Sequence, residues 1–156
     1  MKLLLMIALA GLSVSAMAQS APKVEVFPAA DVHGQFAKLT DQAKAKGLAA
    51  GTLADYGGMS LRLAVRAQSG GAEVHAHFDD VIIVTDGTAT LVTGGTVVDG
   101  KTSPNGETLG ASVKDGVSQT ISTGDVIHIP AGIPHQMLLA PGATFTYFLM
   151  KVKPQP

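Results

Sequence analysis

The segment from Gly124 to His135 constrains the fold of this chain more than any other. It joins a glycine turn, the short apolar run 126–129 and a corner that contains Pro130 and Gly132. Proline fixes one backbone dihedral angle, and glycine permits a tight bend. The segment therefore predicts a short strand that ends in a rigid turn, from which His135 emerges with few alternative orientations.

A second segment supplies two more imidazoles. His75 and His77 are separated by one residue. On an extended strand, residues at this spacing project from the same face of the sheet. If the strand lies near the corner, His75, His77 and His135 can share one ion. His128 is one residue away from Pro130, and we expect it to point outward.

The alternation of apolar and polar residues over 59–66 is typical of a half-buried strand. Arg62 and Arg66 occupy polar positions of this pattern, so we expect them to face solvent; an inward arginine would instead suggest a carboxylate-bearing substrate. Further short runs indicate an all-β sandwich or barrel. They cover residues 74–78, 81–85, 88–93, 110–113, 118–122, 126–129, 135–140 and 144–151.

Other parts of the chain predict the surroundings of this sheet. Residues 24–27 suggest a first strand, and the apolar spacing from Asp31 to Gly47 predicts a helix. The run 81–84 is apolar on both faces, which favours a central strand. Residues 99–109 are expected to form one long polar loop.

The N-terminus has the pattern of a secretory signal peptide. A positive residue precedes an apolar stretch, and small residues around Met17 mark a cleavage site after Ala18. We expect a signal peptide over 1–18, one domain over 19–150 and a short tail over 151–156. The chain has no cysteine. These features predict a bacterial protein that is periplasmic or secreted.

Charge excludes two classes of partner. The chain has 11 basic and 12 acidic side chains, without a basic stripe. Electrostatic binding to nucleic acid or to a membrane surface is therefore not expected. A small molecule remains as the expected ligand or substrate.

The corner resembles the second motif of the cupin superfamily, G-x5-P-x-G-x2-H-x3-N. Gly124, Pro130, Gly132 and His135 meet this pattern, and Leu139 stands at the asparagine position. The resemblance implies a single-domain antiparallel β-barrel of the cupin, jelly-roll-like type, with a short N-terminal helix.

The first cupin motif, G-x5-H-x-H-x3/4-E-x6-G, is matched less closely. His75, His77 and Gly87 fit, while the carboxylate position is taken by Asp80, with Asp79 as its rival. The resemblance implies that His75, His77 and His135 bind a divalent transition metal, with Asp80 as a fourth candidate ligand. Zinc, copper, iron, manganese and nickel are all compatible with such a site.

The resemblance leaves the reaction open, because cupins include oxygenases, isomerases and lyases as well as proteins that only bind ligands. We expect a metal-dependent enzyme that acts on a small organic molecule. The alternatives are a non-catalytic module that binds a small ligand or a metal, and a structural role through a homodimer. Glu73 and Tyr56 are candidate acid or base groups without a supporting motif.

Overall fold

The structure is a computed structural model that describes residues 23–154, so the predicted signal peptide lies outside the described residues. One helix and twelve strands occur within them. Their bounds are α1 Ala29–Lys46, β1 Leu48–Asp55, β2 Met59–Arg66, β3 Ala72–His75, β4 Asp79–Thr93, β5 Thr96–Val98, β6 Lys101–Thr102, β7 Glu107–Gly110, β8 Ser112–Lys114, β9 Val117–Ser122, β10 Val126–Ile129, β11 His135–Leu138 and β12 Phe145–Val152.

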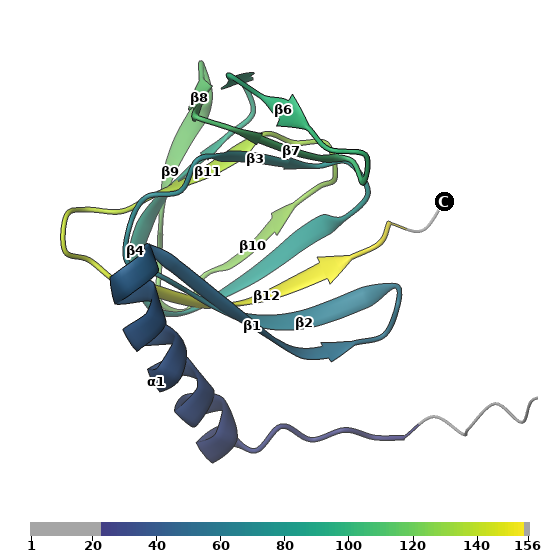
Figure 1. Ribbon diagram of the computed structural model, residues 1–156, viewed down its shortest axis with the longest axis vertical. Helices are drawn as coiled ribbons and strands as arrows, with labels where there is room; N and C mark the ends of the chain where they lie inside the picture. The colour runs from purple at the N-terminus through teal and green to yellow at the C-terminus, as the bar shows by residue number, and fades with distance from the viewer. Residues whose placement is uncertain (1–22, 155–156) are drawn as a thin grey trace, which may run out of the picture.

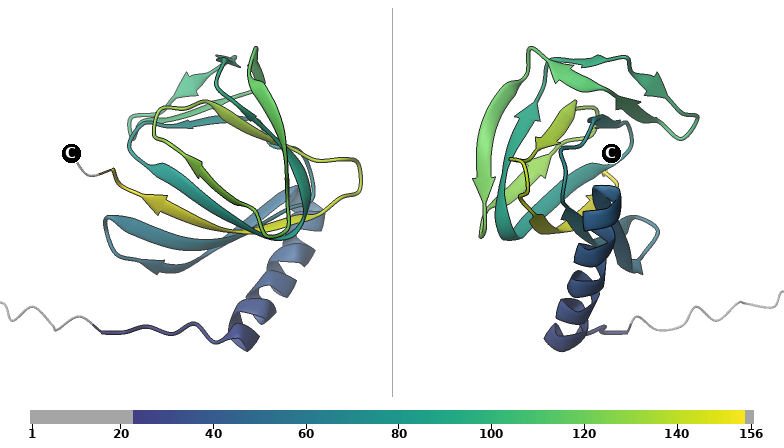
Figure 2. Two further views of the ribbon diagram at one scale, coloured as in Figure 1. Left: turned by 180° about the vertical axis from the view of Figure 1, so that it is seen from behind. Right: turned by 60° about the vertical axis from the view of Figure 1, so that its left-hand side comes forward.

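All strand pairs are antiparallel, and they curl around a common interior (Figure 1). The main sheet runs in the order β1, β2, β12, β4, β11, β3, β7, β6, and both β9 and β10 pair with β4. The turned views show the same curved wall with α1 outside it (Figure 2). The prediction of an antiparallel jelly-roll barrel with one helix is confirmed.

Strand β4 is the longest strand and belongs to both walls of the barrel. Residues 79–87 pair with β12, and residues 88–93 pair with β9. The bend between these halves falls at Gly87, whose φ is 91°. The sequence predicted two separate strands here, because Asp86-Gly87 is typical of a turn. Residues 81–84 do form a central strand between β10 and β12, but Ile83 is 36% exposed, so this run is not covered on both faces as its apolar character predicted.

Helix α1 covers the outer face of β1 and β2. It ends at Lys46, where the amide of Gly47 donates a hydrogen bond of 2.7 Å to the carbonyl of Ala43. Its buried residues Leu39 and Ala43 pack in one cluster with Leu63 and Val65 of β2. Among the described residues, no helix has both the length and the apolar character needed to cross a bilayer.

This packing corrects the predicted orientation of β2. Leu63 and Val65 face the helix, so the alternate residues face the interior of the barrel. Arg62 and Arg66 line an interior cavity and do not point to solvent as the sequence pattern predicted. The alternation of apolar and polar residues in β2 was predicted correctly. The sequence of β2 alone does not show that a helix covers the apolar face from outside the barrel.

Other segments also differ from the prediction. Residues 24–27 form no strand, whereas β1 was not predicted. The expected loop over 99–109 contains β6 and most of β7. Strand β12 continues through Lys151 and Val152, which the sequence placed in the tail.

We predict that Gly87→Ala destabilises the protein more than Gly132→Ala. Both glycines have positive φ, but a Cβ at Gly87 would lie 2.3 Å from the carbonyl oxygen of Thr144, whereas a Cβ at Gly132 meets no atom within 4 Å. Backbone strain alone costs about 1–2 kcal/mol, and a clash with backbone adds roughly 1–3 kcal/mol. Urea denaturation gives both free energies of unfolding. Equal losses would contradict the role of Gly87 as the close-packed bend.

Candidate metal centre

A cavity of about 140 Å³ lies inside the barrel, between β1, β2, β3, β4, β11 and β12. Apolar core residues form part of its wall, including Ile82 and Met137. The polar and charged residues of the wall are Arg62, Arg66, Glu73, His75, Asp80, His135, Tyr147 and Lys151. A larger groove of about 550 Å³ lies along α1, but none of the predicted ligands lines it.

His75 is the last residue of β3 and is buried. Its Nδ1 contacts a carboxylate oxygen of Glu107, the residue opposite it on β7. A carboxylate accepts hydrogen bonds, so Nδ1 carries the proton and donates it to this contact. In the neutral ring, Nε2 then holds a lone pair. This atom is buried, makes no hydrogen bond, and faces the cavity.

His135 begins β11, directly after the predicted corner. Its Nδ1 donates a hydrogen bond of 3.0 Å to the carbonyl oxygen of Ile133, which leaves Nε2 as an acceptor. Burial lowers the pKa of His135, and the nearby His75 lowers it further, so the neutral form is favoured. This is the form in which histidine binds metals.

The corner is tied to both walls of the cavity. Gly132 has a φ of 81°, and its amide donates a hydrogen bond of 2.9 Å to the carbonyl oxygen of His75. Asp79 accepts a hydrogen bond of 2.8 Å from the amide of Ala131. The corner therefore fixes the backbone that carries His135 against the end of the strand that carries His75.

Two carboxylates complete the cluster, and each is shared between a cation and His75. Oε1 of Glu73 lies 2.9 Å from Nη2 of Arg66, and its Oε2 lies 3.7 Å from Nε2 of His75. Oδ1 of Asp80 lies 3.1 Å from Nζ of Lys151, and its Oδ2 lies 3.2 Å from the same His75 nitrogen. One oxygen of each carboxylate is therefore directed at the histidines.

His75 and Asp80 each stabilise the charged form of the other. Burial lowers the pKa of His75, but the nearby Asp80 carboxylate favours the protonated ring and outweighs burial, so the pKa is raised. Burial raises the pKa of Asp80, but His75 and Lys151 outweigh this effect, so the pKa is lowered. Asp80 is accordingly an anion in the folded protein at neutral pH.

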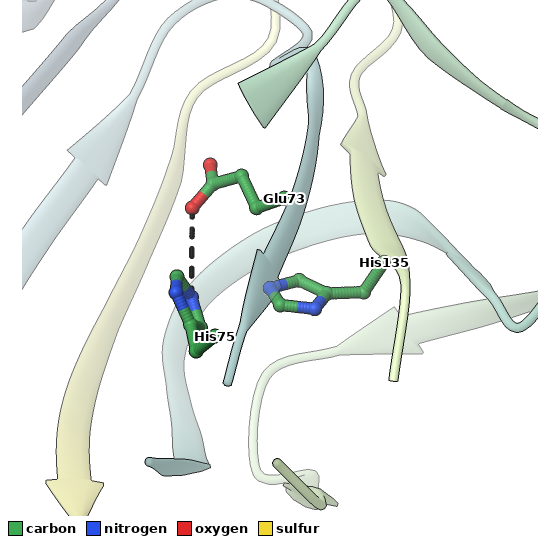
Figure 3. Close-up of side chains that lie close together, drawn as sticks. All are labelled: Glu73, His75 and His135. Carbon is green, nitrogen blue, oxygen red and sulfur yellow. Dashed lines mark ion pairs between the residues drawn. The ribbon is translucent and has the colours of Figure 1, made fainter. Parts of the chain in front are cut away.

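Donor atoms of Glu73, His75 and His135 lie within 4.8 Å of one another (Figure 3). Oδ2 of Asp80 lies 3.8 Å from Nε2 of His135. Ligands of a small transition metal stand about 2.0–2.2 Å from the ion, so adjacent donors are roughly 3 Å apart. The observed spacing fits such an ion after small side-chain movements.

Comparison with solved structures identifies the architecture. The cupin domain of Cnp3 from Schizosaccharomyces pombe superposes with a TM-score of 0.51 at 7% identity, over 69% of this chain and 65% of that chain. This chain has the cupin fold. A double-stranded β-helix protein from Klebsiella pneumoniae matches with a TM-score of 0.50 at 14% identity, over 68% of this chain and 76% of that one.

A putative mannose-6-phosphate isomerase from Ralstonia eutropha also matches the cupin barrel, with a TM-score of 0.50 at 12% identity, over 69% of this chain and 85% of that one. No protein-family model and no curated protein matches the sequence. At these identities the comparisons show the fold alone.

The cupin barrel brings His75, His135 and Asp80 together, but it leaves His77 outside the cluster. Strand β3 ends at His75, and His77 is exposed beyond it. The spacing of two residues along β3 instead places Glu73 beside His75. Glu73 had no motif to support it, and only the correct strand bounds would have identified it.

The two aspartates have different surroundings in the cupin barrel. Asp80 points into the cavity, whereas Asp79 contacts Nε2 of His128 at 2.9 Å. The side chain of His128 is 57% exposed, as its predicted outward orientation requires. Tyr56 is also exposed and donates a hydrogen bond to Glu25, away from the cavity.

We predict that Lys151→Met lowers the free energy of unfolding of the metal-free protein by about 3 kcal/mol, because it leaves a buried carboxylate without its cation. In an Asp80→Asn background the same change should cost less than about 1 kcal/mol, since no charge is left unpaired. Chelator-treated protein in urea denaturation provides both values. Equal losses in the two backgrounds would show that Lys151 acts independently of Asp80.

Proposed function

We propose that this protein is a metal-dependent cupin enzyme that acts on a small organic molecule. The observation that carries the proposal is Nε2 of His75. This buried nitrogen has no hydrogen-bond partner and faces two carboxylate oxygens within 4 Å. The Glu107 carboxylate on the opposite side of the ring is the arrangement that orients metal-binding histidines.

The donor set needs a cation at its centre. With both rings neutral, Nε2 of His75 and of His135 are acceptors, and the facing oxygens of Glu73 and Asp80 are acceptors as well. Acceptors that face one another in a buried space are unfavourable. A proton on Nε2 of His75, which the raised pKa of this ring favours, satisfies that nitrogen and the carboxylate oxygens that face it. A divalent metal would satisfy Nε2 of His135 as well.

The residues fit a first-row transition metal. Two imidazoles with one or two carboxylates and no thiolate are compatible with zinc, iron, manganese, nickel or copper. His75, His135 and Glu73 would hold the ion, with Asp80 beside it. Such an ion supplies Lewis-acid or redox chemistry and lowers the pKa of bound water. Glu107 and the Ile133 carbonyl hold the two rings in the orientation that ligation requires.

A small substrate is favoured by the cavity. Its volume of about 140 Å³ is smaller than the roughly 300–1,000 Å³ of pockets that hold drug-sized ligands. We also propose that the protein is periplasmic or secreted, because residues 1–18 have the pattern of a signal peptide.

We predict that the purified protein retains close to one metal ion per chain, and that His75→Ala and His135→Ala each abolish this retention, because each removes a nitrogen ligand. Glu73→Gln should weaken it, since the amide oxygen carries no charge. Mass spectrometry of the elements, after dialysis against a weak chelator, measures the metal content.

Two histidine variants serve as matched controls. His128→Ala changes an exposed ring whose Nε2 contacts Asp79, and His77→Ala changes an exposed ring outside the cluster. Both should retain the metal of the unaltered protein. Loss of metal in His77→Ala would add His77 to the ligand set, and full retention in His75→Ala would refute the site.

The alternative is a cupin that binds its ligand without turnover. We expect the metal-loaded protein to convert at least one member of a panel of diols, enols and 2-oxo acids, followed by oxygen consumption and product mass. His75→Ala should lose this conversion. Tight binding of a panel member without product would favour the binding module.

A further inference from the structure

Arg62 lies on the inner face of β2 and lines the same cavity as the proposed metal ligands. Ala64 and Arg66, two and four residues further along β2, line the cavity with it. Leu149 of β12 is its partner in the adjacent strand. A guanidinium group therefore reaches the wall of a cavity that also contains His75 and His135.

The guanidinium of Arg62 has no anionic partner within residues 23–154. Its Nε is buried and makes no hydrogen bond. Arg66, by contrast, bonds to Glu73 and to the hydroxyl of Tyr147. An unpaired buried donor costs free energy, and the cost is larger when the donor is charged. Arg62 is therefore available to bind an anionic group of a ligand in the cavity.

The charged residues of the cavity wall indicate which charge a ligand of Arg62 would carry. Three cationic side chains and two carboxylates line it. Each carboxylate already contacts one cation, Glu73 with Arg66 and Asp80 with Lys151. Glu107 is bound to the opposite side of the His75 ring and is not part of the cavity wall. The wall thus carries one cation more than it has carboxylates, and a divalent metal would add further positive charge, which favours an anionic ligand.

We infer that Arg62 binds the carboxylate of a small organic acid whose remaining part reaches the histidine cluster. The planar fork of a guanidinium matches the two oxygens of a carboxylate. The cavity admits only a short-chain acid, given its volume of about 140 Å³. The inference rests on the proposed function and specifies its substrate class.

Calorimetric titration with pyruvate and succinate tests this assignment, with methyl pyruvate and succinamide as counterparts that lack the charge. We expect at least one acid to bind more tightly than its uncharged counterpart. Arg62→Met and Arg62→Gln should weaken that binding at least tenfold. Lys44→Met removes one positive charge from an exposed position of α1 and should leave binding unchanged.

The same titrations in chelator-treated protein, with the metal content of every sample measured, separate this inference from the metal site. Arg62→Met should retain the metal of the unaltered protein. If the unaltered protein holds no metal but still binds acids through Arg62, the metal proposal alone fails. Absence of acid binding in the unaltered protein, equal binding in both folded Arg62 variants, or binding of inorganic phosphate in place of the acids would overturn the assignment.

Discussion

The structure depends on how the barrel accommodates charge in its interior. Glu73 and Asp80 each pair one oxygen with a cation and direct the other at Nε2 of His75. Removing charged groups from water is costly unless they are paired, so the two cations stabilise the carboxylates in a buried position. The oxygens that remain free converge with two histidine nitrogens. The same pairing that permits burial thus creates a set of metal ligands.

Helix α1 makes this interior possible. By covering Leu63 and Val65 from outside, it assigns the apolar face of β2 to the outer layer and turns Arg62 and Arg66 inward. If the apolar residues of β2 faced the interior of the barrel, Arg62 and Arg66 would face outward instead. The helix therefore contributes to the chemistry of the cavity although it does not line it.

The sequence predicted the fold well and the site in part. The corner from Pro130 to Gly132 is a local feature, fixed by proline and glycine, so it identified the cupin architecture and the position of His135. The inward arginines depend on packing against α1, which is not encoded within β2. The sequence did not identify Glu73 as a metal ligand, because it predicted a strand over 74–78. The strand observed, Ala72–His75, begins two residues earlier and therefore includes Glu73 on the same face as His75.

In the proposed site, two histidines and a carboxylate hold one metal ion inside the barrel. A crystal structure of the metal-loaded protein, with anomalous scattering measured at the absorption edge of the metal, would show whether the ion lies there. We expect one anomalous peak between Nε2 of His75 and Nε2 of His135, within bonding distance of Glu73 or Asp80. A peak ligated by His77, or no peak in the cavity of a crystal grown with excess metal, would contradict it.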